Sequence, residues 1–213
     1  MEKKLLIKIL KKQKKDDLIK LLMTSFDNLS LSDQFQIFNE IYQKGLISKN
    51  NVNKIVNDIK IFYKESLSKE YYAPFDINSK NYMIIPEKTK IWCNKMADYY
   101  KKTIYLTNKC RHNLALECYD MLYYLENNMC EEIVFADELG SWMIPINQSE
   151  IMPKYVESIS RVCKPEDFKN RIINLMEIDN YSFNKLSVYN EAIKIGTLEQ
   201  KKEIKDLIKG FDK

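Results

Sequence analysis

Residues 48–68, with the sequence SKNNVNKIVNDIKIFYKESLS, show the clearest periodic pattern in the chain. Apolar side chains recur at Val52, Ile55, Ile59 and Phe62, and polar residues fill most of the positions between them. Residues three and four apart lie on the same face of an α-helix. The segment therefore predicts an amphipathic helix that buries one face against the rest of the protein.

The same spacing recurs on both sides of this segment and predicts helices along most of the chain. Two helices, or one bent helix, are expected in the first 27 residues, and the further helices are expected at about 30–44, 87–105, 108–127 and 153–163, with three more beginning near Pro165, Ser182 and Thr197. Thr197 with Gln200 three residues later fits a capping box. Thr107 or Asn108 is the expected cap of the helix at 108–127.

Composition supports an all-α fold. The 213 residues include only four Gly and five Pro, whereas sheets and phosphate-binding loops need Gly for turns and close backbone approach. A Rossmann domain, a P-loop and a β-sandwich are therefore improbable. We expect about nine or ten helices, arranged as stacked antiparallel hairpins or as an irregular bundle.

Two segments interrupt the helical pattern. Residues 71–86 are rich in turn-forming residues and are interpreted as a loop that connects an N-terminal lobe, 1–70, to a C-terminal lobe, 87–213, unless the chain forms one continuous domain. Residues 131–146 are expected to be irregular or to form a short hairpin, because apolar residues alternate there on both sides of a polar turn.

The spacing of the expected helices points to a known type of architecture. Pro165, Ser182 and Thr197 follow one another at intervals of 17 and 15 residues, so a helical hairpin would span roughly 34 residues. By this periodicity alone the chain resembles the helical-hairpin repeat proteins of the tetratricopeptide or HEAT type. The resemblance implies stacked hairpins, although no Trp, Gly, Ala and Pro repeat signature accompanies it.

The five cysteines favour a reducing compartment. Their number is odd and no Cys-x-x-Cys spacing occurs, which is typical of reduced thiols in a cytoplasmic protein rather than of a secreted disulfide framework. No apolar run approaches the roughly 20 residues that span a bilayer. His112 is the only histidine, and we expect neither a metal site nor a cofactor.

The positive charge of the chain is concentrated at its N-terminus. Residues 1–15 contain seven Lys and one Glu, while the whole chain has a net charge of only +4. A basic groove across the fold is therefore not predicted, and nucleic acid is an unlikely partner. A local anion-binding face remains as an alternative to a merely solvated helix face, and it consists of Lys4, Lys8, Lys11, Lys12 and Lys15.

The opposite asymmetry occupies residues 113–153, which contain eight carboxylates and no Lys, Arg or His. Acidic side chains beside Tyr and Trp can hold a basic peptide, because cationic groups pair with the acids while their stems lie on the rings. The expected partner-binding residues are Glu117, Tyr119, Asp120, Tyr123, Asp137, Glu138 and Trp142. Two alternatives stay open: the acids face solvent at a loop tip, or basic residues of the N-terminal helix neutralise them.

Catalysis is not expected. Asp137 and Glu138 are adjacent and point in different directions, and neither a His nor a glycine-rich loop stands beside them. The sequence therefore predicts a non-catalytic protein-interaction module that binds a basic protein partner. The alternative is a nucleic-acid-associated or regulatory protein that uses the Lys-rich N-terminal helix.

Overall fold

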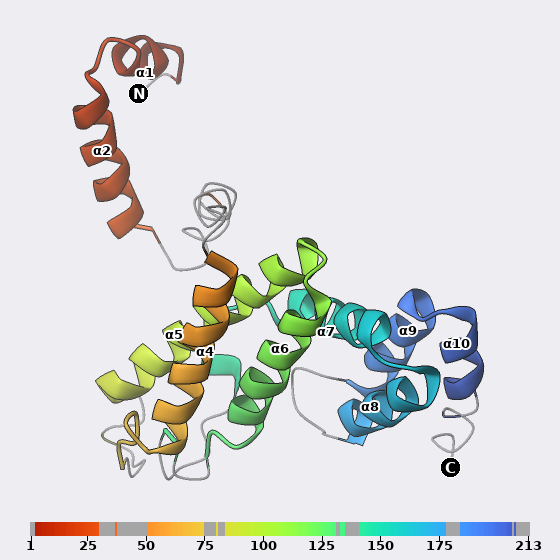
Figure 1. Cartoon of the computed structure of the whole chain (residues 1–213). Coiled ribbons are helices and arrows are strands. Elements are labelled where there is room, and N and C mark those ends of the chain that lie inside the picture. The colour runs from red at the N-terminus through yellow and green to blue at the C-terminus, as the bar shows by residue number, and fades with distance from the viewer. Residues whose placement is uncertain are drawn as a thin grey trace. The chain divides into compact units, whose positions relative to one another are not determined.

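The computed structural model describes residues 3–29, 37, 51–74, 80, 84–130, 133–134, 141–177, 184–205 and 207. The chain divides into two compact units, residues 1–48 and residues 49–213. Nine α-helices and no strand occur among the described residues (Figure 1). The expected all-α fold is confirmed.

The first unit contains helices α1 (Lys3–Leu10) and α2 (Lys15–Asp27), so the two helices expected in the first 27 residues are confirmed. Backbone N–H groups of Lys12 and Gln13 donate to the last carbonyls of α1 and close its C-terminal turn. Asp16 and Asp17 lie in the first turn of α2, where the helix dipole favours carboxylates. The helix expected at 30–44 lies outside the described residues apart from Ile37, which is helical.

The second unit holds seven of the described α-helices. They are α4 (Asn51–Leu67), α5 (Glu87–Asn108), α6 (His112–Asn127), α7 (Gln148–Val162), α8 (Pro165–Glu177), α9 (Lys185–Ile195) and α10 (Leu198–Ile204), with a 3₁₀ turn, η1 (Ser141–Met143), before α7. The described residues of the 131–146 segment form turns and η1, so the segment is irregular as expected. Of the expected hairpin turn, 137–141, only Ser141 lies within the described residues, where it begins η1.

The helices of the second unit pack mainly on their neighbours and next neighbours in the sequence. Helices α4, α5 and α6 contact one another at one end, α8, α9 and α10 do so at the other, and α7 lies between the two groups (Figure 1). Helix α4, which precedes the segment 71–86, packs on α5 and α6, which follow it, and all three belong to the unit that begins at residue 49.

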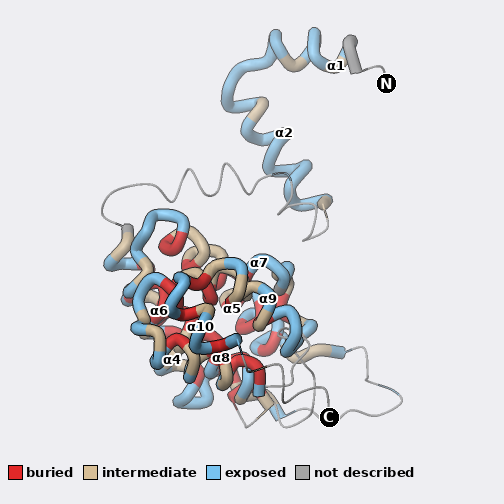
Figure 2. The backbone as a smooth tube through the Cα atoms, turned by 90° about the vertical axis from the view of Figure 1, so that its right-hand side faces the viewer, coloured by how far each residue is buried: buried red, intermediate tan, exposed pale blue. Residues whose placement is uncertain are grey.

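Aromatic side chains fill the core of the second unit, whose buried segments are drawn in red in Figure 2. The largest fully buried side chains include Phe62, Trp92, Tyr100, Tyr119 and Phe168. The helix predicted from residues 48–68 is present as α4. Its expected inner face is buried at Ile55, Ile59 and Phe62 and partly buried at Val52.

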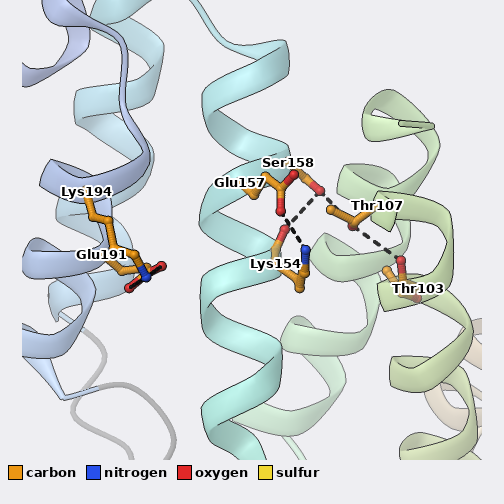
Figure 3. A network of polar contacts seen from close by, with 7 residues as sticks. All are labelled: Thr103, Thr107, Lys154, Glu157, Ser158, Glu191 and Lys194. Atoms are coloured by element: carbon orange, nitrogen blue, oxygen red, sulfur yellow. Dashed lines mark hydrogen bonds and ion pairs between the residues drawn. The ribbon is translucent and has the colours of Figure 1, made fainter. Parts of the chain in front are cut away.

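Buried polar side chains join α7 to its neighbours. The hydroxyl groups of Thr107 on α5 and Ser158 on α7 lie 3.0 Å apart, and Figure 3 shows this contact with the Lys154–Glu157 ion pair on the same helix. On the other side, the buried side-chain amide of Gln200 on α10 donates to the carbonyl oxygens of Ser160 and Cys163. The last turn of α7 is therefore fixed to α10 by hydrogen bonds.

The helix ends follow the predicted chemistry at some positions and not at others. Pro165 begins α8, and the capping box of Thr197 and Gln200 begins α10, as expected. The cap of α9 is Asn184 rather than Ser182, because the Asn184 side chain accepts from two backbone N–H groups of the first turn. Thr107 is buried within α5, and α6 begins only at His112.

The five cysteines are free thiols in the structure. Among the described residues, no helix is both long enough and apolar enough to cross a bilayer.

Candidate functional site

A groove of about 440 Å³ opens between α6, α7 and α8. We call it the α6–α8 groove. It contains two of the residues predicted from the acidic window, Asp120 and Tyr123. The complete lining consists of Asp120, Tyr123, Tyr124, Asn127, Asn128, Tyr155, Ile159, Arg171, Asn174 and Leu175.

An ion pair spans the groove from α6 to α8. Nη1 of Arg171 donates to both carboxylate oxygens of Asp120, at 2.8 and 3.0 Å, and the Tyr155 hydroxyl donates to the same carboxylate at 2.7 Å. The hydrogen bond to Asp120 raises the pKa of Arg171, so the guanidinium stays charged. Burial, followed by the negative charge of Asp120, raises the pKa of Tyr155 well above its ordinary value. The three side chains hold one another in a fixed arrangement.

The rings of two further tyrosines contact the Tyr155 ring. The rings of Tyr119 and Tyr155 are stacked with centroids 5.0 Å apart, and Tyr123 meets Tyr155 edge-on at 5.7 Å. Tyr119 is fully buried, so it belongs to the core and cannot touch a partner directly. The aromatic contacts restrict the Tyr155 ring, and through it the carboxylate that binds Arg171.

Several groups in the groove remain accessible to a ligand. The Arg171 side chain is about one-third exposed, at 37%, and within the described part of the chain its Nε and Nη2 atoms donate to no protein atom. Asn174 on α8 is exposed. The Tyr124 ring is also exposed, and it makes an edge contact with Tyr63 on α4. The groove thus offers cationic donors, an amide and an aromatic face.

The carboxylates on α6 have partners within the protein. Glu117 pairs with Lys60 on α4 at 2.7 Å, and the buried carboxylate of Glu126 accepts a hydrogen bond from the Tyr100 hydroxyl at 2.5 Å. Lys60 and Arg171 are therefore paired with two of the acids of this helix, Glu117 and Asp120. Much of the negative charge predicted for a partner is therefore compensated internally.

Trp142 lies in η1 and is 64% exposed, which is unusual for so large an apolar side chain. The residues that follow it, Met143 and Ile144, pack into or against the core and fix the position of the turn. Asp137 and Glu138 lie outside the described residues. The structure therefore shows the aromatic residue of this predicted site without its two neighbouring acids.

The predicted anion-binding face belongs to the first unit. The side chains of Lys8, Lys11, Lys12 and Lys15 are exposed, and the Lys4 side chain is outside the described set.

Sequence reasoning missed three residues that shape the groove: Tyr155, Arg171 and Asn174. They lie outside the 113–153 window, in α7 and α8. Arg171 carried one weak signal, because the chain has only three Arg against many Lys, and Arg suits fixed pairing with a carboxylate. Nothing in the local sequence of α8 shows that it packs near α6.

Within the described ranges, no group of three or more His, Cys, Asp or Glu side chains is placed to hold a metal ion. Comparisons with protein-family models, with curated proteins and with solved structures found no match for the chain. The fold therefore defines an all-helical protein and no family assignment follows.

Proposed function

We propose that this chain is a protein-interaction module that binds a peptide segment of its partner in the α6–α8 groove. The observation that carries the proposal is the guanidinium of Arg171. Asp120, which also accepts from the Tyr155 hydroxyl, holds it in place, while two of its nitrogen atoms have no protein acceptor among the described residues.

The electrostatics of the groove favour a neutral or polar ligand group over a strongly charged one. The positive charge of Arg171 is balanced by Asp120 at hydrogen-bond distance, so the pair presents directional N–H donors rather than a net charge. Main-chain carbonyl oxygens of a peptide are suitable acceptors. A binding group that is already ordered also loses less conformational entropy when the partner arrives.

The other accessible side chains match the same type of ligand. The amide of Asn174 can donate and accept, as a peptide group does, and the exposed ring of Tyr124 offers an apolar face to a side chain of the partner. A volume of about 440 Å³ holds a few residues of an extended segment rather than a folded domain.

The order of helix packing supports an interaction role in a second way. Helices that pack on neighbours and next neighbours in sequence form an elongated stack, as in helical repeat proteins, whose surfaces serve as binding platforms. A tetratricopeptide- or HEAT-type arrangement remains our proposal for the architecture.

A preference for a basic partner is a separate part of the proposal. It depends on Trp142 together with Asp137 and Glu138, since Glu117 and Asp120 are paired internally. In this arrangement Trp142 would act as an aromatic anchor outside the groove lining, where a cationic side chain of the partner could lie against the ring. The role is one of binding in the cytoplasm, without a catalytic step.

The proposal can be tested by quantitative co-purification from cell extract with the full chain. The groove variant combines Tyr124→Ala and Asn174→Ala, and a separate variant carries Trp142→Ala. Leu198→Ala is the matched control, because Leu198 is an exposed apolar residue on α10, away from the groove lining. Thermal melting of each variant establishes that the fold is retained.

We expect one protein that is retained by the wild type and by Leu198→Ala and is lost with the groove variant. Its loss with Trp142→Ala as well would place the anchor in the same interface. Retention of every co-purified protein by the groove variant would contradict the proposed role of the groove.

A further inference from the structure

Helices α1 and α2 carry large apolar side chains at the protein surface. No side chain of α2 is buried, and Figure 2 draws both helices almost entirely in the colour of exposed residues. The exposed fractions lie between 44% and 57% for Leu5, Ile7, Ile9, Ile19, Leu21, Leu22 and Met23. A surface this apolar is typical of a binding face.

Most of the apolar residues share one side of each helix. On α1, the four residues Leu5, Leu6, Ile9 and Leu10 fall within an arc of about 140° at 3.6 residues per turn, with Lys8 outside it. On α2, Leu18 and Leu22 lie on one side and Asp17 and Lys20 on the other. Both helices are therefore amphipathic.

Positive charge accompanies the apolar face of α1 and the turn after it, while the three Asp of residues 3–29 all lie in α2 beside two Lys. Residues 3–29 contain eight Lys and three Asp, and the exposed side chains of Lys8, Lys11 and Lys12 lie in or directly after α1. An amphipathic helix with Lys on its polar side lies in the interface of a bilayer, with its apolar face among the acyl chains and its lysines at anionic headgroups.

We propose that residues 3–29 bind the surface of an anionic lipid bilayer. The helices lie on the membrane and do not cross it, in agreement with their lengths of 8 and 13 residues. The attachment would hold the helical stack at a membrane, whatever partner the α6–α8 groove binds. The proposal is independent of the function of that groove.

Two other occupants account for only one of the two properties of this surface. A nucleic acid would satisfy the lysines but leave side chains such as Leu22 and Met23 in water. A second copy of the chain would cover the apolar faces but would offer no anionic partner to the lysines. An anionic bilayer satisfies both the apolar and the cationic groups.

Vesicle flotation with the full chain tests the proposal. The probes are vesicles of phosphatidylcholine alone and of phosphatidylcholine mixed with phosphatidylserine. The charge variant changes Lys8, Lys11 and Lys12 to Gln. Its control makes the same change to Gln at Lys164, Lys202 and Lys205, which are exposed in the second unit. The apolar variant changes Ile19 and Leu22 to Ser. Its control makes the same change to Ser at Leu186 and Leu198, which are exposed on α9 and α10.

We expect the wild type to float with the mixed vesicles and much less with phosphatidylcholine alone. Three neutralised lysines should weaken partitioning about a hundredfold, because each contributes roughly a fivefold gain near an anionic surface. The apolar variant should weaken it by about tenfold or more. Both controls should bind as the wild type does, and circular dichroism should confirm that every variant is folded.

Four results would overturn the proposal. The first is failure of the wild type to float with anionic vesicles. The second is full binding of the apolar variant to these vesicles, which would mean that binding depends on electrostatic attraction alone. The third is a dimer in sedimentation velocity that the apolar variant dissociates while vesicles stay unbound. The fourth is salt-sensitive binding to duplex DNA by the wild type and the apolar variant alike, without vesicle binding.

Discussion

The Asp120 carboxylate on α6 accepts two hydrogen bonds from a single nitrogen atom of Arg171 on α8, 51 residues further along the chain. This geometry leaves the other two guanidinium nitrogens without a partner among the described residues. The same carboxylate binds the hydroxyl of Tyr155 on α7. One carboxylate thus connects three helices and holds in place the side chain to which we assign ligand binding.

The first prediction concerns the stability that this ion pair contributes. Arg171→Ala leaves Asp120 with the Tyr155 hydroxyl alone, and we expect a loss of about 1 kcal/mol in the free energy of unfolding, since the pair is partly exposed. Lys194→Ala is the control, because it removes an ion pair within α9 whose Lys194 side chain is 73% exposed, and it should cost less than about 0.5 kcal/mol. Urea denaturation measures both, and equal losses would show that the groove pair has no special role.

The second prediction concerns two helix ends. Lys69 and Cys110 have φ angles of 66° and 56°, each at the position after the C-cap of a helix. Around each of them the backbone makes both hydrogen bonds of a Schellman motif: Lys69 N to Ser66 O and Glu70 N to Glu65 O, then Cys110 N to Thr107 O and Arg111 N to Leu106 O. Glycine adopts this conformation without the steric cost of a Cβ atom.

Lys69→Gly and Cys110→Gly should therefore each raise the free energy of unfolding by up to about 1 kcal/mol. Denaturant midpoints of the two variants and the wild type measure the effect. Lys164→Gly, at a position whose φ is not positive, is the control and should not stabilise the protein. A loss of stability in both variants would mean that the side chains of Lys69 and Cys110 matter more than the backbone strain.

The existence of the helices could be predicted from the sequence, but the left-handed positions at their ends could not. Helix existence followed from the spacing of Ile55, Ile59 and Phe62, since burial of one face dictates that spacing locally. Helix ends were harder to predict, because a chain with only four Gly uses other residues at left-handed positions. Local sequence carries no signal that Lys69 or Cys110 adopts such a conformation.

The candidate site was predictable only in part, for a similar reason. Asp120 and Tyr123 were found from the acidic charge and the aromatic residues of 113–153, which are local properties of the sequence. Arg171 and Tyr155 come from other helices, and their approach to Asp120 depends on how those helices pack. The internal pairing of Glu117 with Lys60 was hidden for the same reason.

The third prediction concerns the thiols and their pH dependence. Burial raises the pKa of both Cys93 and Cys118 to about 12, whereas Cys110 is exposed. We expect Cys110 to react rapidly with an aromatic disulfide reagent at pH 8, while Cys93 and Cys118 react only after unfolding. Mass spectrometry of the labelled peptides identifies each site.

The same raised pKa values fix the sign of a stability change. A thiol with a higher pKa in the folded state than in the unfolded state stabilises the fold below the ordinary value of 9.0, and this stabilisation is lost as the pH rises through about 12. Stability should therefore fall above pH 9. Rapid labelling of Cys93 in the native protein would contradict the burial on which this argument depends.

The fourth prediction separates the two tryptophans. Trp92 is fully buried and donates to the Ser66 hydroxyl, while Trp142 is 64% exposed. Iodide should quench the fluorescence of Trp142 and not that of Trp92, so Trp142→Phe should leave a blue-shifted emission that iodide does not quench. Trp142→Phe should also change the unfolding midpoint little. An unquenched wild type would show that Trp142 is covered in solution and is not available as an anchor.

The most direct test of the groove measures how tightly the full chain binds a peptide selected against it from a displayed random library. Dissociation constants from calorimetry are compared for the wild type, Tyr124→Ala, Asn174→Ala and the control Leu198→Ala. We expect each groove variant to bind at least about tenfold more weakly, which corresponds to about 1.4 kcal/mol, and the control to bind as the wild type does. Equal affinities for all four proteins would contradict the assignment of peptide binding to the α6–α8 groove.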